Sequence, residues 1–258
     1  MTTIRVHNVS KRHEGEYVLR DVSLSVEHET YLGLIGPGGA GKSLLLKIIC
    51  GLVEPDEGYV EIDDTNVQAL SEAEADELRL RIGMLFQNYA LFDFMTVSGN
   101  IAFPMRQAAE TGDEEIERRV EELLGEIGLP DAGHKYPKEL SGGMKKRVSF
   151  ARAVARKPPL LLYDDPTAGL DPVTSSKIFR LLEKLKEEHG TTAITVSHDL
   201  GGIREICDRV AMLKKGELIF DGSVEQVEEC QREDVREFWH GHETDVLETS
   251  RIAGGEVS

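Results

Sequence analysis

The sequence predicts an α/β domain: a parallel-sheet core, an antiparallel β layer beside it and a helical subdomain inserted into it. Three observations support this prediction. A short apolar segment at 31–35 precedes a glycine-rich loop and a Leu/Ile-rich segment that begins at Ser43. Strand-like and helix-like segments alternate from residue 160 onward, which is typical of a parallel sheet. Alternating apolar residues near the N-terminus indicate half-buried strands of a second sheet.

The composition restricts the class of protein. A chain of 258 residues can form one large α/β domain, or a core with an inserted subdomain. Its apolar runs are too short to cross a bilayer and its N-terminus has no apolar signal segment, so we expect a cytoplasmic protein. The net charge of −17 argues against nucleic acid as a partner, since such binding depends on Lys and Arg.

The glycine-rich loop fits the pattern G-x-x-x-x-G-K-[ST], with Gly36, Gly41, Lys42 and Ser43 at the fixed positions. Glycines let backbone N–H groups turn toward phosphates, and the helix that follows points its positive dipole end at them. Lys42 is expected to reach the β- and γ-phosphates of a nucleotide, and the Ser43 hydroxyl to bind Mg²⁺. The residues expected to bind the nucleotide here are Gly36, Gly38, Gly39, Ala40, Gly41, Lys42, Ser43 and Leu44.

Alternating apolar residues predict the strands of the antiparallel layer near 4–9, 22–26 and 58–62. Within this layer, the ring of His13 or of Tyr17 is a candidate to stack on an adenine. A ring in a β layer is more often a packing residue, and that alternative stays open.

The middle of the chain predicts the inserted helical subdomain. A compact apolar strand ends at Gln87, and an irregular aromatic stretch that follows it is closed by Pro104. An amphipathic helix then runs from Asp113 to Ile127, and a second helix begins at Ser141, a favourable N-cap. We expect the core at 1–87 and 157–222, the helical subdomain at about 88–156, C-terminal helices at 223–240 and an acidic, mobile tail at 241–258.

Four polar side chains directly follow predicted strands, at the edge of a parallel sheet where ligands bind. Asp164 has the position of a carboxylate that holds Mg²⁺ opposite Ser43, and Asp165 would face an attacking water. Gln87 could orient that water or complete the metal shell, and His198 could donate to the γ-phosphate. The expected catalytic residues are Lys42, Gln87, Asp165 and His198, and the expected metal ligands are Ser43, Gln87 and Asp164.

Two further motifs carry a resemblance to a known family. The sequence LSGGM at 140–144 resembles the signature motif of ATP-binding cassette (ABC) ATPases, usually LSGGQ, and PTAGLD at 166–171 resembles the segment that ends in their D-loop. With the phosphate loop, Gln87 and His198, five motifs stand in the family's order over residues 1 to 230. The resemblance implies a P-loop ATPase of the ABC type, with ATP and Mg²⁺ as cofactors.

The resemblance also implies partners. In this family two subunits enclose two ATP molecules head to tail, so Ser141, Gly142 and Gly143 would contact the γ-phosphate bound by a second copy of the chain. A serine N-cap followed by glycines does present free N–H groups to an anion. Separate permease subunits are also implied. In the family, a helix of the permease binds in a groove beside the helical subdomain, and the residues that could line this groove here are Tyr89, Phe92, Phe94 and Phe103. Packing within the helical subdomain is the alternative role for these rings.

One residue departs from the family pattern. The family normally carries Glu as its catalytic base, whereas this chain has Asp165. Its side chain is one methylene shorter, and general-base catalysis depends strongly on reach. Our hypothesis is that Asp165 serves as the base, with slowed or impaired hydrolysis as the alternative.

Three details resemble the ATPases of the Mla/Mce systems, which transport phospholipids between membranes. They are ALFD at 90–93 with NIAFP at 100–104, the pair Lys145 and Lys146, and VREFWHG at 235–241. The alternative for the lysine pair is a solvated helix face. The resemblance implies an Mce-domain lipid-binding protein and a small STAS-type regulatory subunit as partners, and a peripheral location on the cytoplasmic face of the inner membrane.

Two other functions remain open. The ATPase of a small-solute importer would share every ATPase motif and differ in its membrane partner. A soluble cassette protein that acts on DNA or ribosomes is the second alternative. Such proteins often carry basic surfaces, which the acidic composition disfavours.

Overall fold

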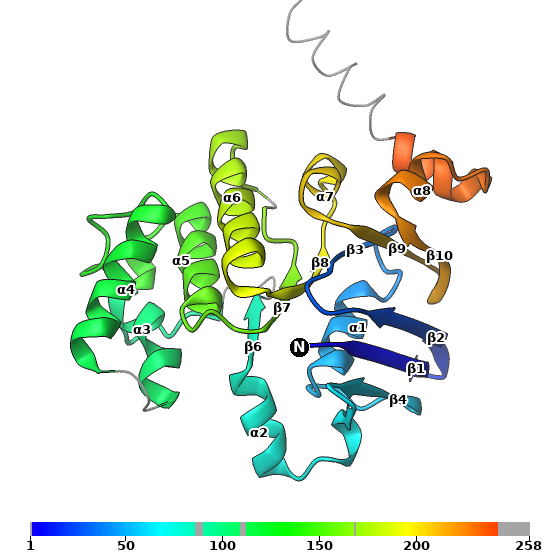
Figure 1. Cartoon of the computed structure of the whole chain (residues 1–258), viewed down its shortest axis with the longest axis horizontal. Helices are drawn as coiled ribbons and strands as arrows, with labels where there is room; N and C mark the ends of the chain where they lie inside the picture. Colours follow the sequence, from blue (N-terminus) through cyan, green and yellow to red (C-terminus); the bar gives the residue numbers. More distant parts are fainter. Residues whose placement is uncertain (1, 86–89, 109–111, 168, 242–258) are drawn as a thin grey trace, which may run out of the picture.

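The computed structural model describes residues 2–85, 90–108, 112–167 and 169–241. Two sheets form its centre (Figure 1), as the sequence predicts. The antiparallel sheet has the order β2-β1-β4-β5, and the six-stranded sheet has the order β10-β9-β3-β8-β7-β6, in which β10 alone is antiparallel to its neighbour. The strands of the first sheet are β1 (Ile4–His13), β2 (Glu16–Val26), β4 (Glu57–Ile62) and β5 (Thr65–Asn66). Those of the second are β3 (Tyr31–Ile35), β6 (Ile82–Leu85), β7 (Leu160–Asp164), β8 (Thr192–Val196), β9 (Arg209–Lys214) and β10 (Glu217–Ser223).

Helices cover both faces of the six-stranded sheet. Helix α1 (Lys42–Ile49) lies between the two sheets, because its buried residues share one apolar cluster with β1, β2 and β3. The opposite face is covered by α5 (Gly142–Val154) and α6 (Pro172–His189). Further helices are α2 (Glu72–Leu80), α3 (Val97–Ala108), α4 (Asp113–Glu126), α7 (Leu200–Ile206), α8 (Val224–Glu228) and the short 3-10 turns η1 (Val67–Ala69) and η2 (Pro137–Glu139).

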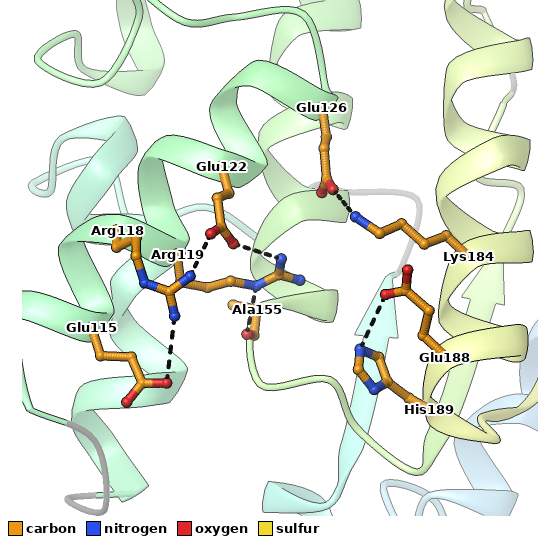
Figure 2. Close-up of polar contacts among 9 residues, drawn as sticks. All are labelled: Glu115, Arg118, Arg119, Glu122, Glu126, Ala155, Lys184, Glu188 and His189. Atoms are coloured by element: carbon orange, nitrogen blue, oxygen red, sulfur yellow. Dashed lines mark hydrogen bonds and ion pairs between the residues drawn. The ribbon is translucent and has the colours of Figure 1, made fainter.

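Helices α3, α4 and α5 lie to one side of the six-stranded sheet (Figure 1, green). Their buried faces join α6 and Tyr163 of β7 in a single apolar cluster. Figure 2 shows the polar contacts at this junction, where Lys184 donates to Glu126 (Nζ–Oε1, 2.8 Å) and Arg119 donates to the carbonyl of Ala155 (3.4 Å). Exposed ion pairs contribute only about 0–1 kcal/mol each to the stability of the fold. The apolar cluster therefore provides most of the interaction that holds α4 near α6. The division into core and subdomain stays our prediction.

Two helices differ from the sequence-based expectation. Helix α2 was not predicted, although Ser71 and Glu74 form a capping box at its start. Helix α3 occupies the stretch expected to be irregular, and Pro104 lies inside it rather than closing it. A proline at this position removes the bond that its N–H would donate to the carbonyl of Asn100. The apolar face of Val97, Ile101 and Met105 still buries the helix against its neighbours.

Asn100 organises the turn that precedes α3. Its fully buried amide accepts from the N–H of Phe92 (2.8 Å) and donates to the carbonyls of Phe92, Met95 and Thr96. We expect Asn100→Ala to lower the free energy of unfolding by about 1–3 kcal/mol, because buried backbone groups lose their partner. Urea unfolding checks this value against Arg106→Ala, an exposed position on the same helix. Equal stability of the two variants would contradict the role of Asn100.

The C-terminal helix, residues 233–241, packs against α7, α8 and β9. Val235 and Trp239 are fully buried in this cluster. The guanidinium of Arg204 on α7 lies 4.6 Å from the centre of the Trp239 ring and donates to the Trp239 carbonyl (3.0 Å). The tail was predicted at 241–258; Gly241 belongs to this helix, and residues 242–258 lie outside the described residues. No helix among the described residues combines the length and apolar character needed to cross a membrane.

Candidate functional site

The phosphate loop connects β3 to α1 and requires glycine at two points. A Cβ at Gly36 would lie 2.0 Å from the carbonyl oxygen of Leu213, and Gly36 has φ +136°. A Cβ at Gly41, with φ +97°, would lie 2.6 Å from a methyl carbon of Leu19. Any side chain would therefore displace the neighbouring strand or loop. These two glycines close the loop tightly at both ends, before Lys42 and Ser43 begin the helix.

Lys42 is buried, with 6% of its surface exposed. Its ammonium donates to the carbonyls of Gly36 (2.6 Å) and Pro37 (2.9 Å), so the side chain lies along the loop. Burial lowers its pKa, while the charges of Asp164 and Asp165 oppose this shift. The loop therefore holds the Lys42 ammonium in place, within electrostatic reach of the two carboxylates.

A cavity of about 360 Å³ lies over the loop. It brings together sequence-predicted residues from three strands, which confirms that their carboxyl ends meet at one edge of the sheet. The lining residues are Val18, the segment 38–44, Asp164, Val196 and His198. Val18, which the sequence did not single out, reaches the cavity because β2 approaches the loop at Gly41.

Ser43 and Asp164 supply a hydroxyl and a carboxylate to this cavity. Asp164 ends β7 and is 4% exposed. Hard oxygen donors of this kind suit Mg²⁺, which is commonly held by one or two protein oxygens together with substrate phosphates. The two residues therefore fit the predicted metal site. Gln87, the third predicted ligand, lies outside the described residues.

Asp165 directly follows β7 and is 7% exposed. Its φ is +61°, and its N–H donates to the carbonyl of Val196 at the end of β8 (2.8 Å). Asp tolerates this left-handed conformation better than longer side chains do. Burial raises the pKa of Asp165, while the charges of Lys146 and His198 oppose the rise.

A second cavity, of about 570 Å³, adjoins the first at His198, which lines both. Asp165, Thr167 and Leu170 line this second cavity together with residues of α6 and α7. His198 is exposed, and the next residue, Asp199, caps α7 by accepting from the N–H of Gly202 (3.1 Å). The structure thus separates the two carboxylates: Asp164 faces the phosphate loop and Asp165 faces the adjoining cavity.

Two other predicted groups line neither cavity. Ser141 caps α5 as predicted, with its hydroxyl accepting from the N–H of Met144 (3.3 Å), and both Ser141 and Gly142 are exposed. His13 is exposed at the β1–β2 hairpin, opposite Glu16, and lines neither cavity. The other adenine candidate, Tyr17, stands next to Val18, and the guanidinium of Arg12 covers its ring at 4.3 Å.

Comparisons with known proteins agree with this geometry. A family model described as "ABC transporter" matches residues 19–168. The methionine import ATP-binding protein MetN 2 of a Bacillus cereus strain is 44% identical over 225 residues, which cover 86% of this chain and 66% of that protein. The methionine import ATP-binding protein MetN of Carboxydothermus hydrogenoformans is 44% identical over 207 residues, 80% of this chain and 61% of the relative. The chain thus spans just under two thirds of these relatives' length.

A solved dimeric structure of an ATP-binding cassette in a post-hydrolysis state, bound to ADP and Pi, superposes with a TM-score of 0.81. It is 35% identical and covers 86% of this chain and 98% of its own. A further structure, described as the ATP-binding subunit of an ABC transporter, has a TM-score of 0.79 at 26% identity and covers 88% of this chain and 92% of its own.

Proposed function

Because this chain belongs to the ABC transporter family and carries its ATP-binding domain, we propose that it hydrolyses ATP to power a separate permease that imports a small polar solute. We infer the class of solute from the 44% identity to a methionine import ATP-binding protein over 225 residues. An amino acid of the methionine type is therefore the first substrate to test.

The phospholipid interpretation drawn from the sequence has no support from these relatives. Its three details lie in the aromatic stretch, in the Lys145–Lys146 pair and at the C-terminal end, and they do not outweigh the similarity to importers. The Mce-domain and STAS-type partners rested on the same details and are not carried further. The importer, which the sequence left open as an alternative, is the better-supported function.

We propose that the cavity over the phosphate loop binds the phosphates of ATP. The loop amides and Lys42 would hold the β- and γ-phosphates, and Ser43 and Asp164 would hold Mg²⁺, which supplies charge neutralisation at the phosphates. Asp165 would accept the proton of the attacking water, and His198, which lines both cavities, would donate to the γ-phosphate. Gln87 keeps its proposed role in orienting the water.

We further propose that two copies of the chain form the complete site. The exposed start of α5 presents the N–H groups of Gly142 and Gly143, which a helix leaves without partners inside itself. Neither glycine lines the chain's own phosphate cavity, which supports the use of these amides on ATP held by a second copy. The related cassette solved with ADP and Pi is itself dimeric.

An apolar groove of about 430 Å³ supports a permease contact beside the helical subdomain. Phe92 and Phe103 line it, with their ring centres 4.7 Å apart, so the rings both pack together and face the groove. Phe94 is 75% exposed nearby, and Tyr89 lies outside the described residues. A helix with apolar residues on one face fits such a groove. Through it, the chain would associate peripherally with the cytoplasmic face of the membrane.

Isolation of the chain from its native membranes in mild detergent tests this function. Mass spectrometry of co-purifying proteins is expected to identify a permease and a solute-binding protein, and vesicles containing the purified complex should take up methionine when ATP is supplied. A permease that carries bound phospholipid and an Mce-domain subunit would restore the phospholipid function. Recovery with DNA or ribosomes would exclude transport.

A further inference from the structure

The apolar groove beside the helical subdomain differs in charge from the rest of the protein. Among the described residues, three guanidinium groups and no carboxylate line it, and they belong to Arg79 of α2 and to Arg152 and Arg156 of α5. Four other cavities formed by the described residues each include at least one carboxylate, and the whole chain carries a net charge of −17. A positive groove in an acidic protein favours a partner with negative charge.

Hydrogen bonds to the backbone hold two of these guanidinium groups in place. Arg152 donates to the carbonyl of Ala90 (2.6 Å), and Arg156 donates to the carbonyl of Leu80 (2.6 Å). The guanidinium of Arg152 also lies 5.7 Å from the centre of the Phe92 ring, which lines the same groove. A neutral carbonyl orients a guanidinium without cancelling its charge, and a guanidinium has five N–H donors. The groove therefore presents positive groups that are oriented before a partner binds.

Arg156 is the guanidinium best suited to bind a carboxylate of a partner. Arg79 already forms an ion pair with Asp76 on its own helix (2.6 Å). Arg156 is half-buried, and no carboxylate among the described residues forms an ion pair with it. Arginine can bind a carboxylate through two parallel N–H···O bonds, which combine charge with a fixed geometry.

The shape of the groove restricts the class of partner further. Its volume is about 430 Å³, and its apolar lining comes from Ile82 and Met84 of β6 and from Phe103 and Pro104 of α3, among others. A small free anion would leave this apolar surface uncovered. A helix with apolar residues on one face covers the surface, and it can carry a carboxylate at the border of that face.

We propose that the permease helix that binds in this groove carries an aspartate or glutamate whose carboxylate pairs with Arg156. The apolar face of the helix lies against β6 and α3, and the ion pair fixes the position of the helix along the groove. The inference rests on the proposed permease contact and adds a determinant of partner choice. A permease with a basic residue at the paired position would be rejected, because two like charges would face each other.

Zero-length cross-linking of the native complex tests this pairing. The complex is isolated in mild detergent from cells that carry Arg156→Lys in place of the wild-type chain, and a carbodiimide then couples carboxylates to adjacent lysine amines as amides. We expect mass spectrometry to find the introduced lysine joined to an aspartate or glutamate of the permease. Arg118→Lys is the matched control, because Arg118 is an exposed residue of α4 that pairs with Glu115 and Glu122 of this chain. Its introduced lysine should join to these two residues and not to the permease.

Charge reversal measures how much the pair contributes to binding. Arg156→Glu should lower the amount of permease recovered per chain by about tenfold or more, because two carboxylates would then face each other. Arg118→Glu should recover as much permease as the wild type, and Arg156→Lys should recover more than Arg156→Glu because it keeps the charge. Thermal unfolding checks that each variant is folded. If Arg156→Glu does not fold, the cross-link formed with Arg156→Lys decides the test.

A complex recovered with Arg156→Lys that contains no cross-link from the introduced lysine to a permease carboxylate would overturn the inference and leave the proposed function intact. Wild-type recovery of permease by folded Arg156→Glu would overturn it as well. Equal loss of permease from Arg156→Lys and Arg156→Glu would show that Arg156 acts through shape rather than charge, and would also overturn it. If the wild-type chain itself is recovered without a permease, the proposed function fails instead.

Discussion

Lys42→Ala is expected to remove most of the affinity for ATP. The ammonium of Lys42 is buried and already held along the loop by the carbonyls of Gly36 and Pro37, so no ordering cost opposes its contact with phosphate. Removing one partner of a buried, hydrogen-bonded charge pair costs about 2–5 kcal/mol, which corresponds to a roughly 30- to 4,000-fold higher Kd. Calorimetric titration with Mg-ATP measures this value.

Lys47→Ala is the matched control, because Lys47 belongs to the same helix and is exposed. Its Kd should stay close to that of the wild type. If Lys42→Ala bound ATP as tightly as this control, the cavity over the phosphate loop would not be the nucleotide site. Transport by the assembled complex should fall in parallel with ATP affinity.

Asp165→Asn is expected to lower ATP turnover by about 10²–10⁴-fold, the range typical of a lost general base. Asparagine keeps the shape of the side chain and tolerates the left-handed backbone at this position, where φ is +61°. The backbone bond to the Val196 carbonyl is also kept. ATP binding should therefore remain near the wild-type value while kcat falls, and pre-steady-state measurement of phosphate release distinguishes the two.

Asp165→Glu is the informative companion to this variant. It keeps the charge and restores the length usual in the family, so its turnover should equal or exceed that of the wild type if the gain in reach outweighs the cost of the longer side chain on the left-handed backbone, where φ is +61°. Faster turnover would show that the shorter reach of aspartate limits hydrolysis. Unchanged turnover in Asp165→Asn would show that another group accepts the proton.

Local patterns in the sequence account for much of the fold and of the site. Features that depend only on neighbouring residues in the chain lie in the structure where the sequence pattern predicts them. They are the phosphate loop, the N-cap at Ser141 and the two carboxylates at the end of β7. Helix α2 was missed even though its capping box is visible at Ser71 and Glu74. Helix α3 was missed because tertiary packing outweighs the cost of an internal proline.

Features that depend on contacts across the fold could not be predicted in the same way. A solvated helix face is a natural expectation for Lys146, yet the contact of Phe150 with Tyr163 turns this side of α5 inward. Val18 enters the cavity because a distant hairpin approaches Gly41. The transported substrate is a property of partner proteins, and short motifs such as the Lys145–Lys146 pair favoured a different subfamily from the one that the relatives support.

The packing of Trp239 against Arg204 also provides an optical probe. The chain contains one tryptophan, so indole emission reports from a single, fully buried position. Helix α7, which carries Arg204, begins two residues after His198, so we expect a movement of α7 that follows a rearrangement at His198 to change the surroundings of the indole. Intrinsic fluorescence after rapid mixing with ATP can therefore follow the timing of such movements in unlabelled protein.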